Sequence, residues 1–385
     1  MVRVVGIDPG TKSMDVCALD DGEVYYEKAV DTADVAQRPE ILIEAVEAVM
    51  PVDLISGPSG YGVEITYLRD IPEEILEDWY YEYILLTNKE HIEKAVEKEV
   101  FGALVYYAMT KSAIEMKRRD WPVCYIPGVI QLSTVPRHRK VNKMDMGTAD
   151  KMCVAVLGVF DQAKRLEIPY SETSFIQVEV GFGYNAILGV EEGKIVDGIG
   201  GTTISGPGFL TIASMDAELV QLVGSWDKAD VFAGGCASIS GRLTPEELVD
   251  DVDVDENSKI AWDAMMEGVI KGVRSMCVAV PTPREILISG RLTKIKKVED
   301  ELKKELSGLA PVKRVGWLKE IREVKETAQG YAVVADGIAG GRFESLVEWM
   351  KIREAKGTAM DHIFHPKFEG LKERLTRINS SWSVK

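Results

Sequence analysis

The chain has 385 residues, of which 46% are hydrophobic and 28% charged, a composition typical of a globular protein with two or three domains. It contains 46 Lys and Arg against 62 Asp and Glu, and the net charge of −16 argues against binding to nucleic acid or to an anionic membrane surface. The N-terminus, Met1-Val-Arg-Val-Val-Gly-Ile-Asp8, reaches a charged residue too early for a signal peptide, and every apolar run is too short for a transmembrane helix. We therefore expect a cytoplasmic protein.

The first half of the chain predicts a three-stranded β-meander followed by helices and strands. Residues 4–24 have the pattern of a strand, a glycine turn, a strand, an acidic hairpin turn and a strand. Beyond them, the apolar pattern predicts strands over 53–56 and 123–127, and helices over 40–50, within 89–117 and over 150–166.

The second half repeats this order. Residues 175–195 follow the same pattern as residues 4–24, and three pairs of positions are each 171 residues apart, namely Asp8 and Glu179, Gly10 and Gly181, and Gly22 and Gly193. This coincidence favours a duplicated half over two unrelated hairpins. The pattern then predicts a strand over 285–289 and helices over 259–279, 293–307 and 326–339. Two such halves predict two α/β domains with mixed sheets that face each other across a cleft.

The two glycine turns suggest nucleotide binding. Glycine lets the backbone approach an anion closely, and the N–H groups of a turn can point at phosphate oxygens. A carboxylate at the end of the preceding strand can hold the water shell of a Mg²⁺ ion that bridges the phosphates. Asp8 with Gly10, Thr11 and Lys12 fits this arrangement, and Glu179 with Gly181 and Gly183 fits it again.

These motifs resemble those of a known superfamily. Gly6-Ile-Asp8-Pro-Gly10-Thr-Lys-Ser13, the copy at Glu179 and the segment Ser289-Gly290-Arg291 are similar to the phosphate-1, phosphate-2 and adenosine motifs of the superfamily that contains acetate kinase, the sugar kinases, the heat-shock chaperone ATPases and actin. The helix that contains Gly330 resembles the small-residue helix after the adenosine motif. The similarity covers about residues 3–345 and is greatest to an archaeal family of predicted butyrate kinases.

The resemblance implies a fold and a set of ligands. It implies two ribonuclease H-like halves with mixed five-stranded sheets flanked by helices, over 1–170 and 171–346, followed by a helical tail over 347–385. It implies ATP and Mg²⁺ as cofactors, with the metal at Asp8 and Glu179. The residues implied to bind the nucleotide are Gly10, Thr11, Lys12, Gly181, Gly183, Ser289, Gly290, Arg291 and Gly330.

A cationic segment between the halves is exceptional in so acidic a chain. It contains Arg137, His138 and Arg139, and is followed by the start of a predicted helix. Cations and the N–H groups of a helix N-terminus together favour an anion. The position also matches an Arg/His segment of acetate kinase. We therefore expect these three residues to hold the substrate and to stabilise the transferred phosphoryl group. Asp145 and Asp150 are ambiguous, because each could support the metal or act as a base.

The leading hypothesis is an ATP-dependent kinase that phosphorylates a small molecule, in particular a short-chain carboxylate. Such an acceptor is already ionised at pH 7, so catalysis would depend on alignment and charge neutralisation. A sugar or polyol kinase is an alternative and requires Asp145 or Asp150 as a general base. A nucleotide-binding module with little catalysis is another, because the second phosphate motif and the adenosine motif are irregular. A homodimer is expected from the resemblance to acetate kinase.

Overall fold

The computed structural model describes residues 1–97, 101–318, 324–371 and 373, and it divides into two compact units. Unit 1 consists of Met1–Met144, Thr148–Val156 and Trp317–Lys385, and unit 2 consists of Asp145–Gly147 and Leu157–Gly316. The boundaries at 170/171 and 346/347 that the sequence predicts for the duplicated halves stay a prediction. A compact unit need not coincide with a duplicated half, because a segment from late in the chain can return to pack on an early strand.

Unit 1 is built on a six-stranded mixed sheet with the order β3-β2-β1-β4-β6-β5. The first three strands form the predicted antiparallel meander, β4 pairs in parallel with β1 and β6, and β5 is antiparallel to β6. The resemblance implied five strands, and the sixth, β5, is too short to leave a periodic signal in the sequence. The strands are β1 (Arg3–Pro9), β2 (Ser13–Asp20), β3 (Glu23–Asp31), β4 (Leu54–Ser56), β5 (Thr66–Tyr67) and β6 (Val123–Tyr125).

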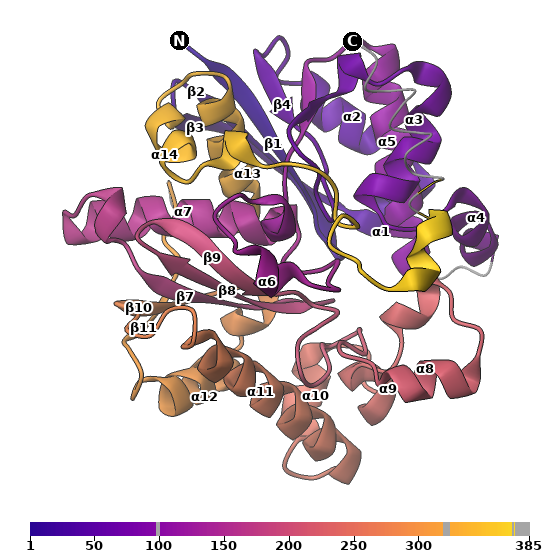
Figure 1. Ribbon diagram of the computed structural model, residues 1–385, viewed down its shortest axis with the longest axis vertical. Helices are drawn as coiled ribbons and strands as arrows, with labels where there is room; N and C mark the ends of the chain where they lie inside the picture. The colour runs from indigo at the N-terminus through magenta and orange to yellow at the C-terminus, as the bar shows by residue number, and fades with distance from the viewer. Residues whose placement is uncertain (98–100, 319–323, 372, 374–385) are drawn as a thin grey trace. The chain divides into compact units, whose positions relative to one another are not determined.

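Helices cover both sides of this sheet (Figure 1). The helix α13 packs on β1, β2 and β4, whereas α1 and α2 contact β2 and β3 and are themselves covered by α5. Every residue of α13 is buried, and a Cβ added at Gly6 of β1 would lie 2.2 Å from the backbone nitrogen of Ala332, so this helix lies directly on the strand. The helices of unit 1 are α1 (Thr32–Gln37), α2 (Glu40–Glu47), α3 (Glu73–Trp79), α4 (Lys89–Glu97), α5 (Phe101–Arg118), α6 (Arg137–Lys140), α13 (Glu326–Ile338) and α14 (Glu344–Trp349), together with the first residues of α7 (Ala149–Leu166).

Unit 2 is built on a five-stranded sheet with the order β11-β10-β7-β8-β9. Its strands are β7 (Phe175–Val180), β8 (Asn185–Glu191), β9 (Lys194–Ile199), β10 (Glu285–Ser289) and β11 (Val312–Arg314). The remainder of α7 belongs to this unit, and a Cβ at its Gly158 would lie 2.9 Å from the ring of Phe175. The other helices are α8 (Ala217–Val223), α9 (Cys236–Ser240), α10 (Pro245–Asp251), α11 (Glu256–Met276) and α12 (Lys296–Leu306).

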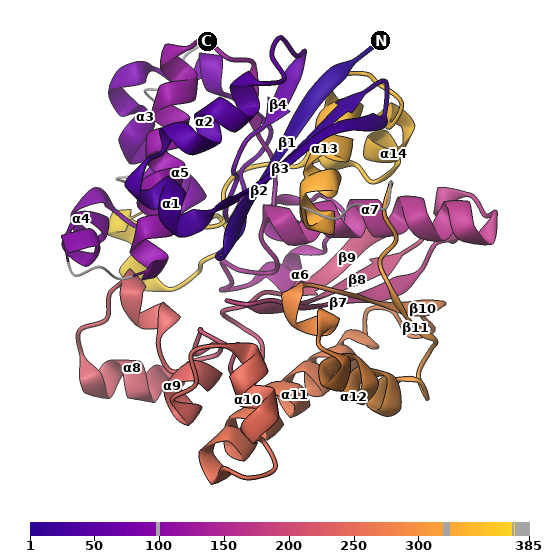
Figure 2. The same ribbon diagram turned by 180° about the vertical axis from the view of Figure 1, so that it is seen from behind.

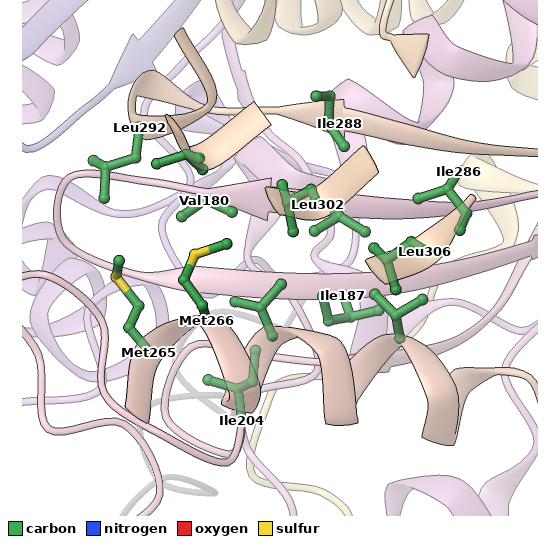
Figure 3. Close-up of a cluster of buried hydrophobic side chains, with 14 of the residues drawn as sticks. Val180, Ile187, Ile204, Met265, Met266, Ile286, Ile288, Leu292, Leu302 and Leu306 are labelled. Carbon is green, nitrogen blue, oxygen red and sulfur yellow. The ribbon is translucent and has the colours of Figure 1, made fainter. Parts of the chain in front are cut away.

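The core of unit 2 lies between its sheet and the helices α11 and α12 (Figure 3). Ile286 and Ile288 are two positions apart on β10, so both side chains lie on the face of the strand that packs in this core. Leu302 and Leu306 extend into the core from one face of α12. Within the described ranges, none of the helices of either unit combines the length and the apolar surface that a membrane crossing requires.

The two sheets repeat one another in detail. The order β3-β2-β1-β4-β6 in unit 1 corresponds to β9-β8-β7-β10-β11 in unit 2. A register shift occurs between Ala18 and Leu19 and again between Gly189 and Val190, which are equivalent positions 171 residues apart. The hairpin turns at Asp21-Gly22 and Glu192-Gly193 both have positive φ at both residues, as two-residue hairpin turns with glycine do. The chain therefore has the duplicated ribonuclease H-like fold that the sequence indicated.

The described part of the C-terminal segment returns to unit 1 in short pieces (Figure 2, where it is yellow). After α14 come a short 3₁₀ turn over Ile352–Glu354, a β-bridge between Val63 and Thr358 and a second 3₁₀ turn over Pro366–Phe368. A helical tail over 347–385 was expected; residues 372 and 374–385 lie outside the described residues.

Candidate functional site

The first glycine turn lies between β1 and β2 of unit 1. Asp8 is 2% exposed near the end of β1, and the turn that follows contains Gly10, Thr11 and Lys12. The carbonyl oxygen of Gly10 accepts a hydrogen bond of 2.8 Å from the hydroxyl of Thr32, which fixes the turn. The ammonium group of Lys12 lies 3.0 Å from Asp31 at the surface. The turn thus has the form predicted for it, while the side chain of Lys12 is engaged by Asp31.

A buried ion cluster surrounds Asp8. Asp15, which is 1% exposed, is directly opposite Asp8 in the pairing of β1 with β2. Nζ of Lys325 lies 2.5 Å from Oδ2 of Asp8 and 3.7 Å from Oδ2 of Asp15. Burial raises the pKa of Asp8 to about 6, against the attraction of Lys325, and the charges of Asp15 and Asp150 add to the rise. The carboxyl group predicted to support a metal therefore ionises at a higher pH than an ordinary aspartate.

A second ion pair begins helix α7. Asp150 accepts hydrogen bonds from the hydroxyl of Thr148 and, at 2.6 Å, from the ammonium group of Lys151. Burial would raise the pKa of Asp150, but the charge of Lys151 and these hydrogen bonds outweigh it and lower the pKa. Asp150 is therefore ionised and is a weak base.

The cationic segment forms the short helix α6. Arg137 and His138 are exposed and Arg139 is partly exposed, whereas Lys140 is buried and donates a hydrogen bond of 2.7 Å to the carbonyl oxygen of Leu132. The structure therefore presents the first cations of this helix to solvent and uses Lys140 as an anchor.

Asp145 belongs to unit 2 and is held by the glycine-rich segment after β9. Its carboxylate accepts hydrogen bonds of 3.0 Å from the N–H of Gly147 and of 3.1 Å from both the N–H and the hydroxyl of Thr202. A Cβ at Gly200 would lie 1.8 Å from one of its oxygens, so a larger residue there would have to displace this carboxylate. Burial lowers the pKa of Lys228 to about 8, although the charge of Asp145 raises it.

The second glycine turn joins β7 and β8. Glu179 is 6% exposed, and the carboxylate lies beside the turn, with one oxygen 3.8 Å from the position of a Cβ on Gly181. The N–H of Gly181 donates to the carbonyl oxygen of Tyr184 at 3.1 Å, and the carbonyl of Gly183 accepts from Thr211 at 2.8 Å. The turn is therefore fixed from both sides.

The predicted adenosine segment follows β10 in the same unit. Ser289 is paired with Glu179 across the two strands. Gly290 has φ of 91°, and a Cβ there would lie 2.6 Å from the carbonyl oxygen of Val180, so glycine is required. The guanidinium group of Arg291 lies 5.5 Å from the centre of the Phe182 ring. The segment Ser289–Arg291 thus lies beside the second glycine turn. The ligand roles of Glu179, Gly181, Ser289, Gly290 and Arg291 stay predictions.

Gly330, by contrast, lies inside unit 1. A Cβ added there would lie 2.4 Å from the carbonyl oxygen of Cys153 in α7. This close approach of two helices explains the glycine without a ligand.

The comparisons with known proteins identify a family. The model of the family described as "Protein of unknown function (DUF1464)" matches residues 6–365. The chain belongs to this family. No curated protein matches it by sequence.

Solved structures share the fold of this DUF1464 protein. A propionate kinase from Francisella tularensis subsp. tularensis SCHU S4 superposes with a TM-score of 0.57 at 12% identity, covering 86% of this chain and 98% of that one. The acetate kinase of Entamoeba histolytica gives 0.52 at 11% identity, with 80% and 87% covered. That of Porphyromonas gingivalis gives 0.52 at 13% identity, with 80% and 88% covered. At such identities the similarity shows the fold.

Sequence reasoning missed two members of the buried cluster in the DUF1464 protein. Asp15 could have been found, because a turn over residues 10–13 places residues 8 and 15 opposite one another. Lys325 gave no signal, since its contact with Asp8 exists only because α13 returns to β1.

Proposed function

We propose that this DUF1464 protein is a phosphotransferase that moves the terminal phosphoryl group of ATP to a short-chain carboxylate. The observation that carries the proposal is the repeated turn, in which a buried carboxylate stands beside a glycine at Asp8–Gly10 and at Glu179–Gly181. A single such turn would be an ordinary hairpin. Two equivalent turns, in a fold shared with acetate and propionate kinases, support a nucleotide with several phosphates.

The donors around the first turn fit a hydrated Mg²⁺ ion. Mg²⁺ prefers carboxylate oxygens and usually keeps several waters when it is bound together with substrate phosphates. Oδ1 of Asp15 is buried and has no hydrogen-bond partner within the described ranges, and Asp8 lies directly opposite. Mg²⁺ bound with ATP would neutralise the charge of the phosphates. In this proposal Asp8 and Asp15 orient its water shell, and Glu179 is the equivalent carboxylate of unit 2.

The state of the two ambiguous aspartates supports a carboxylate acceptor over an alcohol. An alcohol needs a general base with a pKa near the working pH. Asp145 accepts three hydrogen bonds and thereby holds its own segment to Thr202, and the pKa of Asp150 is lowered by Lys151. Both carboxylates are thus suited to anchoring. A carboxylate acceptor needs no base, because it is ionised already.

The exposed cations of α6 would bind and orient the acceptor. Arg137 and His138 extend into solvent, and Arg139 lies next to them. Arginine forks match a carboxylate or a phosphoryl group with two parallel hydrogen bonds, so these side chains would neutralise charge as it moves between donor and acceptor.

The test is an assay of ADP release with ATP and Mg²⁺ against acetate, propionate and butyrate, and against a panel of sugars and polyols. We expect turnover with a carboxylate, and a loss of about 100-fold or more in kcat/KM for Arg137→Ala or Arg139→Ala. Arg118→Ala, which removes an exposed arginine of α5, is the matched control and should keep full activity. Turnover of a sugar that is abolished by Asp145→Asn or Asp150→Asn would reject the carboxylate acceptor. Tight binding of ATP without any phosphorylated product would indicate a nucleotide-binding module, and failure to bind ATP at all would reject the whole proposal.

A further inference from the structure

Two buried carboxylates face each other at the first turn only. Asp8 and Asp15 are paired across β1 and β2, and both are almost fully buried. The residue equivalent to Asp15 in the second half is Ala186, which is paired with Glu179. Two like charges opposite each other inside a protein are costly unless a cation lies between them. The first turn therefore requires a positive charge that the second turn does not.

Lys325 supplies this charge from the residue before α13. Its Nζ contacts both carboxylates and donates to the carbonyl oxygen of Ser13 at 3.3 Å, while its backbone N–H donates to Oδ2 of Asp15 at 2.8 Å. Burial lowers the pKa of Lys325, but Asp8 and Asp15 outweigh this and raise it, so the side chain is charged. The two carboxylates are therefore neutralised by a part of the chain itself.

The ammonium group also lies on the glycine turn. A Cβ added at Gly10 would lie only 2.0 Å from Nζ of Lys325. The space that glycine leaves open beside the turn is thus filled by a cation. In the proposed function, the same space beside the backbone of Gly10 is where phosphate oxygens would approach.

The cluster as a whole can take more positive charge. Its members are Asp8, Asp15 and Asp150 with Lys325 and Lys151, which leaves one negative charge in excess when all five are ionised. One carboxylate oxygen of Asp15 is buried and unpartnered within the described part of the chain. Lys325 therefore balances the site incompletely, as an exchangeable counter-ion would.

We propose that Lys325 is an internal counter-ion that exchanges partners at the first turn: without nucleotide it holds Asp8 and Asp15, and with ATP it moves to the phosphate oxygens. This inference rests on the proposed function. After the exchange every charge again has a partner, because the phosphates replace the carboxylates as partners of the ammonium group and a divalent cation replaces the ammonium group at the carboxylates. It follows that a divalent cation binds poorly before the nucleotide does, since it would have to displace Lys325 without offering the ammonium group a new partner.

The experiment measures binding of Mn²⁺ to the full chain without nucleotide, by the electron paramagnetic resonance signal of the unbound ion, and binding of Mg²⁺–ATP by calorimetry. In Lys325→Met we expect Mn²⁺ to bind about tenfold or more tightly than in the wild type, and ATP about tenfold or more weakly. Lys325→Arg should behave like the wild type in Mn²⁺ binding. Lys94→Met, which removes an exposed lysine paired with Glu90, is the control and should change neither affinity.

Unchanged Mn²⁺ affinity in a folded Lys325→Met protein would overturn the inference, and so would unchanged ATP affinity. If this variant does not fold, Lys325→Met combined with Asp15→Asn removes one of the two facing charges and gives the same readout at Asp8. A wild type that binds no ATP refutes the proposed function and with it the exchange step, whereas the Mn²⁺ measurement still decides whether Lys325 keeps metal from the carboxylates.

Discussion

Replacing Asp8 by asparagine should stabilise unit 1 at neutral pH, because the folded protein holds this carboxyl group against its preference for water. Burial raises the pKa of Asp8 from the ordinary 3.8 to about 6, even with Lys325 beside it. Each unit of pKa is worth about 1.4 kcal/mol, so ionising Asp8 in the folded state costs up to ~3 kcal/mol. Asparagine has nearly the same shape and carries no charge, and it avoids this cost.

The sign of the pH dependence follows from the raised pKa. Below pH 3.8 the carboxyl group is protonated in both folded and unfolded chains, and its contribution to stability is fully present. As the pH rises through about 6, the folded wild type must ionise a buried group and this contribution is lost. The advantage of Asp8→Asn in the free energy of unfolding should therefore be small near pH 4.5 and reach its full size above pH 7.

Urea denaturation at pH 4.5, 6.0 and 7.5 would measure this difference, and hydrogen exchange of β1 peptides would assign it to unit 1. Asp31→Asn is a control of opposite sign. Burial would raise the pKa of Asp31, but the hydrogen bonds from Lys12 and from the N–H of Ala33 together outweigh it and lower the pKa, so this variant should lose stability at neutral pH. If Asp8→Asn proves less stable than the wild type at pH 7.5, the attraction of Lys325 outweighs burial and the reasoning fails.

Three further substitutions test the packing and the charges. Gly330→Ala should cost about 1–3 kcal/mol in urea denaturation, because its Cβ would collide with a carbonyl oxygen of α7, whereas Gly308→Ala meets nothing within 4 Å and should cost little. Leu302→Ala should lower the free energy of unfolding by about 2–5 kcal/mol, because it opens a cavity in the core of unit 2. The control Val278→Ala, at an exposed position, should lose almost nothing, and equal losses in the two variants would contradict the packing. Burial would raise the pKa of Glu285, but its hydrogen bonds lower it to about 2. Glu285→Gln should therefore be less stable than the wild type at pH 7, and the difference in the free energy of unfolding should narrow as the pH falls from 4.5 toward 2.

The sequence predicted the strands and helices whose ends are set by neighbouring residues in the chain. The strand expected over residues 285–289 is β10 at the same residues, because a short apolar run is stopped there by Ser289 and a glycine with positive φ. The helix expected over 326–339 ends at Ile338. The short strands β5 and β11 carry too few residues to show a period, and their pairing comes from neighbours in the sheet.

The candidate site was predicted where it is built from a turn and missed where it is built from long-range contacts. Gly10 and Gly181 could be found because glycine turns are local features. Lys325 could not, because 310 residues separate it from Asp15 and only the return of α13 brings them together. For Lys12 the local pattern was incomplete. Its charge suggested a contact with phosphate, but the pairing of Ser13 with Asp31 places the carboxylate of Asp31 next to Lys12.

The repeated register shift and hairpin turn carry a historical consequence. Since the same irregularities recur in both sheets, a shared ancestor already contained them, and the sequence has drifted far more than the backbone has. After a duplication, one half can change its residues while the other half keeps the original function. Asp15 and Ala186 are such a divergence: one copy has a buried charge that a distant lysine balances, and the other is neutral at the equivalent position.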